Sequence, residues 1–116
     1  MYQPGLHIIA ALQTNQTERL VEYAPLKELL NGLIAEFDLS KLGEVYHRFE
    51  QGGYTAVVCL SESHISLHTW PEYGRVNLDI YLSNYLRVND ATCQAIYQRL
   101  QLFFNGSVLA EQSISR

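Results

Sequence analysis

Alternation of apolar and polar residues in the middle of the chain limits the fold more than any other feature of the sequence. In residues 64–70 every second side chain is apolar or a threonine, and residues 75–82 repeat the pattern with Val, Leu, Ile and Leu. A period of two is that of a β-strand, because successive side chains point to opposite faces of a sheet. Both segments are therefore predicted to be strands of a sheet that buries one face and leaves the other polar.

The rest of the chain adds further strands and two helices to this sheet. Apolar residues recur at steps of three and four after Pro25, which predicts an amphipathic helix over 26–37. Strands are expected at 6–12, 42–49, 54–60 and 108–114, a loop at 13–19, and a second helix capped by Asn89 or Asp90. In 116 residues this order predicts a single domain over 1–116. The expected fold is an α+β two-layer sandwich, a mostly antiparallel sheet with two helices packed on one face.

Charge and cysteine content exclude several classes of protein. The net charge is −4 and Lys and Arg form no cluster, so no nucleic-acid or anionic-membrane surface is expected. No run approaches the ~20 apolar residues of a membrane span. Cys59 and Cys93 both lie among apolar residues, which predicts two reduced core thiols in a cytoplasmic protein. Only 17% of residues are charged, which favours burial of some surface in an oligomer.

Residues 61–72 are the densest polar segment and the place where chemistry is expected. They hold four hydroxyls, two imidazoles and two carboxylates, groups that serve as nucleophiles, bases and acids. The polar face of an exposed strand has a similar composition, so composition alone leaves both interpretations open. Ser63 and His64 are neighbours and would point to opposite faces of a regular strand, so they are not expected to form a nucleophile–base pair.

Other kinds of site find little support in the sequence. A zinc site needs His and Cys at ligand spacings, but the histidines at 7, 47, 64 and 68 offer only one close pair, and no metal site is predicted. The sequence contains no glycine-rich phosphate loop and no Gly-x-Ser-x-Gly turn. The remaining candidate for a functional site is the segment 61–72, with its hydroxyl, imidazole and carboxylate groups.

The segment 62–74 resembles the processing-site motif of the small bacterial and archaeal S-adenosylmethionine decarboxylases, pyruvoyl-dependent enzymes of spermidine synthesis. The string Glu-Ser-His-x-x-x-His-Thr-Trp-Pro-Glu is long and highly specific, and the resemblance covers most of the chain. Further matches lie at Gly5-x-His7, His47-Arg48-Phe49, Gly53 and Asp79. On these residues the chain is identified as a member of that family.

The resemblance implies self-cleavage between Glu62 and Ser63. The Ser63 hydroxyl attacks the Glu62 carbonyl to give an ester, elimination leaves a dehydroalanine, and hydrolysis yields a pyruvoyl group on the downstream fragment. The products are residues 1–62 and 63–116, which stay packed as one domain. The pyruvoyl carbonyl forms a Schiff base with the substrate amine and accepts the electrons released when CO₂ leaves. Such a rearrangement needs a strained or well-oriented peptide, which is expected at a turn between strands.

The resemblance also implies roles for the surrounding residues. His68 corresponds to the family histidine that assists processing by proton transfer. Glu72 corresponds to a carboxylate that hydrogen-bonds the substrate ribose, Phe49 to an aromatic that packs on the adenine, and His64 is expected among the substrate-binding residues. The structural alternatives are a surface histidine, a solvated turn glutamate and a core phenylalanine. A homodimer with a small-molecule substrate is implied as well.

Three positions depart from the family pattern. Thr55 replaces a serine linked to processing and keeps the hydroxyl, but its extra methyl restricts χ1. Ser83 replaces the cysteine that protonates the product carbon, and a serine hydroxyl is a far weaker acid than a thiol. Ala11 replaces an acidic residue common near the end of the first strand.

These departures leave three functions open. The first is decarboxylation of S-adenosylmethionine, which supplies aminopropyl groups for spermidine. The second is pyruvoyl-dependent decarboxylation of another amino acid, such as ornithine or arginine. The third is a non-catalytic, unprocessed homologue that acts as a partner subunit.

Overall fold

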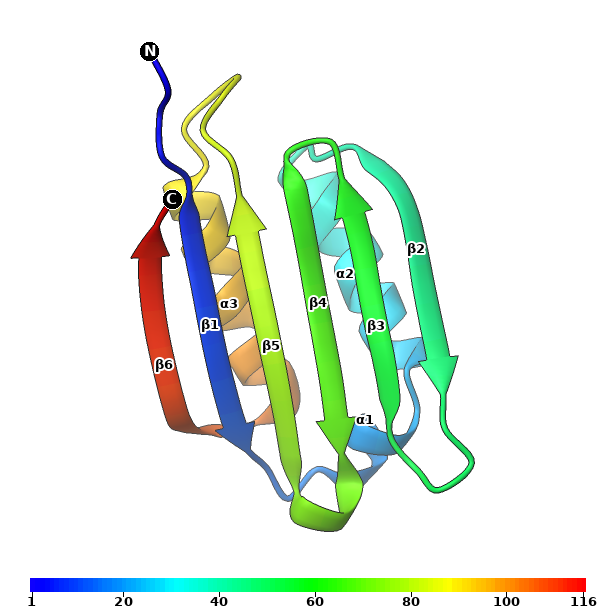
Figure 1. Cartoon of the computed structure of the whole chain (residues 1–116). Helices are drawn as coiled ribbons and strands as arrows, with labels where there is room; N and C mark the ends of the chain where they lie inside the picture. The colour runs from blue at the N-terminus through cyan, green and yellow to red at the C-terminus, as the bar shows by residue number, and fades with distance from the viewer.

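Six strands form a single antiparallel sheet in this computed structural model, which describes residues 1–116 (Figure 1). The strands are β1 (Leu6–Gln13), β2 (Lys41–Arg48), β3 (Tyr54–Leu60), β4 (Ser63–Trp70), β5 (Arg75–Leu82) and β6 (Ser107–Ser115). The helices are α1 (Thr17–Val21), α2 (Ala24–Glu36) and α3 (Asp90–Phe104), with a one-turn 3₁₀ helix at Pro71–Tyr73. The order across the sheet is β2-β3-β4-β5-β1-β6, so β1 is inserted between β5 and β6.

The core lies between one face of the sheet and the helices. Alternate residues of β3, β4 and β5 are buried, as the period of two predicts, and they meet the apolar side of α2 and α3. Fully buried side chains include Leu30 of α2, Leu67 of β4 and Leu100 of α3. All helices lie on the same side of the sheet (Figure 1). The two-layer α+β sandwich is therefore confirmed.

The elements agree with the sequence-based expectation except in two details. Residues 13–19 were expected to form a loop, but Thr17–Val21 form the short helix α1, so three helices rather than two accompany the sheet. Cys59 is exposed rather than a core residue, because Val58 and Leu60 on either side take the inward positions of β3. Cys93 is buried as expected, and burial raises the pKa of its thiol to about 12. None of the helices is both long and apolar enough to traverse a bilayer.

The second face of the sheet carries the polar residues that the alternation assigns to it, and no helix packs on it (Figure 1). His64, Ser66 and His68 of β4 lie on this face beside Asp79 of β5, because each is out of step with the buried positions of its strand. The fold therefore displays the two histidines of the motif, His64 and His68, on one open surface toward the two ends of β4.

Candidate active site

The peptide between Glu62 and Ser63 lies in the turn that joins β3 to β4. Ser63 has a φ of +123°, a backbone conformation that residues with a side chain rarely adopt. Strain of this kind costs about 1–3 kcal/mol and persists only where the surroundings hold it. Ser63 also begins β4, opposite Leu60 of β3 and Leu82 of β5. A strained residue between strands is what the predicted cleavage site requires.

Hydrogen bonds hold both the carbonyl and the side chain of Glu62. Its carbonyl oxygen accepts the backbone N–H of Ser83 at 2.8 Å. Its buried carboxylate accepts two hydrogen bonds from Arg87, at 3.0 and 3.2 Å, and another from the amide of Asn89. Burial favours the neutral acid, but the hydrogen bonds from Arg87 and Asn89 outweigh it, and the pKa of Glu62 lies below its ordinary value.

Asn89 was expected to cap α3, and this prediction was wrong for its side chain. The side chain makes no capping hydrogen bond and instead joins the Glu62 carboxylate to the carbonyl oxygen of Ser83, 2.9 Å away. Arg87 and Asn89 are thus the residues of this site that sequence reasoning missed. Both lie in the irregular segment before α3, where no periodic pattern marks a residue as important.

Ser83 is anchored through its backbone at the end of β5. Its N–H and C=O are both engaged, by Glu62 and Asn89. Gly5 packs against this point so closely that a Cβ there would lie 2.3 Å from the carbonyl oxygen of Leu82 and 3.0 Å from the Cα of Ser83. The glycine of the Gly5-x-His7 match therefore has a physical reason: only glycine lets the first strand approach the residue that holds the Glu62 carbonyl.

Ser63 and His64 do contact each other, contrary to the expectation from a regular strand. Ser63 Oγ lies 3.2 Å from His64 Nδ1. The positive φ of Ser63 breaks the alternation at the first residue of β4, so the two neighbours no longer point to opposite faces. The hydroxyl of the predicted nucleophile therefore has an imidazole nitrogen within hydrogen-bond distance.

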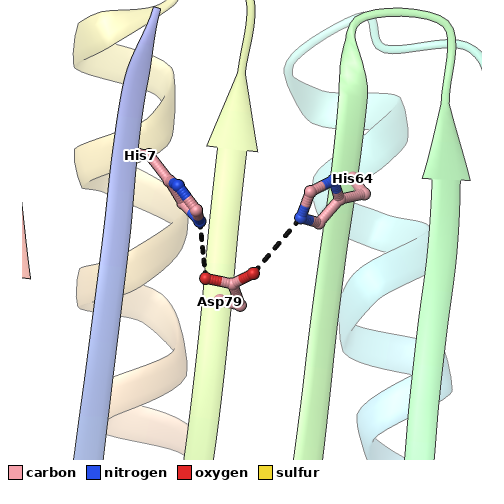
Figure 2. Close-up of side chains that lie close together, drawn as sticks. All are labelled: His7, His64 and Asp79. Carbon is pink, nitrogen blue, oxygen red and sulfur yellow. Dashed lines mark hydrogen bonds and ion pairs between the residues drawn. The ribbon is translucent and has the colours of Figure 1, made fainter. Parts of the chain in front are cut away.

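Three strands bring His64, Asp79 and His7 together on the open face. Figure 2 shows both imidazole rings directed at the Asp79 carboxylate from the strands on either side. His7 Nε2 lies 2.6 Å from one carboxylate oxygen, and His64 Nε2 lies 3.3 Å from the other. The three ligand atoms lie within 4.8 Å of one another, a spacing that a metal ion could bridge. However, Arg116 Nη1 lies 3.2 Å from His7 Nδ1, and its positive charge opposes a cation there.

The other end of β4 holds a second group of predicted site residues. His68 lies opposite Thr55 of β3, with Nδ1 2.9 Å from the threonine hydroxyl. A shallow pocket of about 370 Å³ is lined by both of these residues together with Phe49 and Glu72. Phe49 is 45% exposed, which excludes the core-phenylalanine alternative. The two residues assigned to the substrate and the two assigned to processing are thus brought together.

His64 is not part of this second group, although it was expected among the substrate-binding residues with Phe49 and Glu72. Ser63 and His68 are five residue steps apart along β4, a distance of roughly 17 Å at about 3.3 Å per step. A groove of about 700 Å³ on the same face is lined by His68, Ser66, Asp79 and Ala11 among others, but neither Ser63 nor His64 lines it. Within one chain, therefore, the predicted site residues fall into two groups at opposite ends of β4.

Comparison with known proteins matches the chain to one family. A family model described as S-adenosylmethionine decarboxylase matches residues 6–114. The chain belongs to the S-adenosylmethionine decarboxylase family. The S-adenosylmethionine decarboxylase proenzymes of Archaeoglobus fulgidus and Aquifex aeolicus are each 42% identical to it over 77 residues, 66% of this chain.

The similarity extends to structure. The crystal structure of the adenosylmethionine decarboxylase from Aquifex aeolicus superposes with a TM-score of 0.85 at 29% identity, over 100% of this chain and 92% of that one. In sequence, the aligned segment spans 69% of the Archaeoglobus protein but only 57% of the Aquifex protein. Family and fold are established by these matches.

Proposed function

We propose that this chain is a proenzyme that cleaves itself between Glu62 and Ser63 and whose processed form decarboxylates S-adenosylmethionine. The proposal rests on the conformation and hydrogen bonds of the peptide between Glu62 and Ser63, in a chain that belongs to this family. Ser63 has a φ of +123°, its hydroxyl contacts an imidazole, and the Glu62 carbonyl accepts the N–H of Ser83. A hydrogen bond to that oxygen stabilises the negative charge that develops when the hydroxyl attacks.

The surroundings of Ser63 suit a pyruvoyl group derived from it. Ser63 is only partly buried and lies at the start of β4, next to the open face of the sheet, so an amine could reach it. The pyruvoyl carbonyl would supply the electron sink that loss of CO₂ requires. Ser83 stands where the family has its proton-donating cysteine, and its hydroxyl is a far weaker acid than a thiol. We therefore expect the proton-donation step to be slow in this chain.

A second copy of the chain would complete the site. His68 and Thr55 lie roughly 17 Å from Ser63 by strand geometry, too far to act on it within one chain. An antiparallel pairing of two open sheet faces would bring the Ser63 end of one copy against the His68 end of the other. Exposed apolar side chains on that face, such as Ile9, Val45 and Val57, support a homodimer.

The shallow pocket favours S-adenosylmethionine as the substrate. It presents the exposed ring of Phe49 and the exposed carboxylate of Glu72, groups suited to an adenine and to the ribose hydroxyls. The Ser-to-Thr departure at Thr55 keeps the hydroxyl on His68, at 2.9 Å. The product would supply aminopropyl groups for spermidine. We further propose a cytoplasmic location, since the free thiols of Cys59 and Cys93 are typical of cytoplasmic proteins.

One observation favours a second candidate, pyruvoyl-dependent decarboxylation of another amino acid. Ala11 is buried in the wall of the groove and presents a methyl group where the family commonly has an acidic residue. A site that lacks this carboxylate presents a different charge to the substrate. Ornithine and arginine, which carry a cationic side chain but no adenosyl group, are the alternatives to test.

Intact-mass measurement and a CO₂-release assay test the proposal together. A processed protein yields fragments of residues 1–62 and 63–116, with the second blocked at its amino end by a pyruvoyl group. Release of labelled CO₂ from carboxyl-labelled S-adenosylmethionine, but not from ornithine or arginine, is the expected result. Turnover of one of the other amino acids alone would favour the second candidate. A chain that stays intact and releases no CO₂ would identify a non-catalytic homologue.

A further inference from the structure

We propose that His64, oriented by Asp79, is the base that takes the proton from the Ser63 hydroxyl when the chain cleaves itself. This inference rests on the proposed self-cleavage and assigns its first proton transfer to a residue of the same chain. The geometry is a line of three groups: Ser63 Oγ lies 3.2 Å from His64 Nδ1, and His64 Nε2 lies 3.3 Å from an Asp79 carboxylate oxygen. A hydroxyl, an imidazole and a carboxylate in this order form the arrangement that activates a serine nucleophile.

The contacts of His7 show how the Asp79 carboxylate is used. The guanidinium group of Arg116 has only donors to offer, so His7 Nδ1 must accept its Nη1–H, 3.2 Å away. A neutral His7 then carries its proton on Nε2 and donates it to an Asp79 oxygen at 2.6 Å. One carboxylate oxygen is thereby occupied and its orientation fixed, and the other is turned toward His64 (Figure 2).

The same reasoning assigns the proton of His64. The second Asp79 oxygen is an acceptor, so His64 Nε2 donates to it. The lone pair of the neutral ring then lies on Nδ1, the atom that faces Ser63 Oγ. Asp79 is therefore a positioning residue, because it holds the tautomer of His64 that can accept a proton. His64 is the catalytic residue, because it contacts the reacting hydroxyl.

The proton balance of the first step closes on these groups. As Ser63 Oγ bonds to the carbonyl carbon of Glu62, its proton passes to His64 Nδ1. The bond from that carbon to the Ser63 nitrogen then breaks, and the nitrogen takes the proton back from His64. The product is an ester with a free amine, and no proton, electron or co-reactant enters or leaves. The hydrogen bond from the Ser83 N–H stabilises the oxygen through this step.

His68 cannot fill this role within the same chain. It lies at the opposite end of β4, and its Nδ1 is already in contact with the Thr55 hydroxyl. The resemblance implies that His68 assists processing by proton transfer. We assign that transfer to a step after the ester has formed, in an assembly where the His68 of a second copy lies near Ser63. The two histidines of the motif would act on successive proton transfers.

The test follows cleavage of the pulse-labelled full chain made by cell-free translation. In His64→Gln, the amide can still accept the serine hydrogen bond but cannot take up the proton, so cleavage should slow by at least about 100-fold. His47→Gln is the matched control, since His47 is exposed on β2 and contacts only Phe49 among the aromatic rings. His64→Ala should regain cleavage when imidazole is added, because the His64 side chain is 37% exposed and its place is accessible.

Two further measurements separate a base from a merely structural histidine. Hydroxylamine cuts esters and leaves amides intact, so it should not cleave His64→Gln if the ester never forms. As a single substitution, Asp79→Asn should slow cleavage more than about 10-fold. In a chain that already carries His64→Gln, it should reduce the cleavage rate little further, because Asp79 acts through His64.

The outcomes separate the inference from the function on which it rests. A native chain that cleaves, together with a folded His64→Gln variant that cleaves at the native rate, overturns the inference and leaves the proposed function standing. Accumulation of a hydroxylamine-sensitive ester in His64→Gln also overturns it, by moving His64 to a later step. A native chain that never cleaves overturns the proposed function and the inference together.

Discussion

The two ends of β4 differ in how firmly the fold holds their functional groups. At the Ser63 end, the carbonyl and carboxylate of Glu62 are buried and bound by Ser83, Arg87 and Asn89. At the His68 end, the histidine makes one hydrogen bond, to Thr55, and Glu72 is exposed. The first end is organised to hold a strained peptide, and the second is an open surface.

This difference separates two kinds of chemistry. An intramolecular rearrangement needs its reacting atoms held in place before any ligand arrives, and the Ser63 end provides this with backbone and side-chain hydrogen bonds. A binding surface can stay shallow until a substrate or a second protein chain covers it. Under the proposed function, one strand carries a preorganised cleavage site at its Ser63 end and part of a binding site at its His68 end, which a second copy would complete.

The largest expected effect comes from co-expressing two variants that cannot be processed alone, which tests whether the two ends of β4 meet between copies. Ser63→Ala cannot cleave, and His68→Ala keeps Ser63 but lacks the imidazole at the other end. If the ends meet between copies, co-expression pairs the intact Ser63 end of the His68→Ala chain with an intact His68, and only that chain should be cleaved. SDS gel electrophoresis with the His68→Ala chain tagged shows whether its fragments appear at all; tagged chains paired with another His68→Ala copy should stay uncleaved.

The result for His68→Ala expressed alone is the control for this experiment. Without a partner carrying His68, it should stay uncleaved or stop at the ester. Complete native-rate cleavage of His68→Ala alone would show that the Ser63 end is self-sufficient, and the second copy would then have no part in processing.

Sequence patterns predicted the fold well and the site only in part. The period of two predicted the strands because burial of one sheet face imposes it, and the string from Glu62 pointed to the family that the comparisons show. The cleavage point itself stays a prediction. The Ser63–His64 contact escaped prediction because the alternation rule assumes regular φ angles, and Ser63 has +123°. The meeting of His7 with Asp79 depends on β1 pairing with β5, a long-range contact that local patterns do not encode.

Gly5→Ala should damage the Ser63 end alone. The new Cβ would lie 2.3 Å from the carbonyl oxygen of Leu82, so β1 or the end of β5 must move, and the Ser83 N–H moves with it. We expect a loss of about 1–3 kcal/mol in the free energy of unfolding and slower cleavage. Gly43→Ala is the matched control, because its Cβ would meet nothing within 4 Å. Equal behaviour of the two variants in urea unfolding and in cleavage would contradict this packing.

Glu62→Gln tests whether the charge of the buried carboxylate helps hold the Ser63 end. It is made in the uncleavable Ser63→Ala background so that only stability is measured. The pKa of Glu62 is lowered in the folded chain, so its charge adds stability at pH values above its ordinary pKa, and this stability is lost as the pH falls through the lowered pKa. Glu62→Gln should therefore lower the melting temperature by about 5 °C at pH 7. A difference that persisted undiminished at pH 2 would rule out a role for the charge.

The smallest expected effect is the difference in the free energy of unfolding between Ser63→Gly and Ser63→Ala, which measures the backbone strain at residue 63. Neither variant can cleave, so both stay intact, and they differ only in whether residue 63 pays for a φ of +123°. Glycine adopts that angle freely, and after its greater loss of conformational freedom on folding is subtracted, the Gly variant should be more stable by about 1 kcal/mol. The same pair of substitutions at Ser66, within regular β4, should give the opposite order, because there glycine brings only its entropy cost. Equal or lower stability of Ser63→Gly would mean that the cleavage peptide is held in place without strain, and that hydrogen bonding to Glu62 alone distinguishes this end of β4.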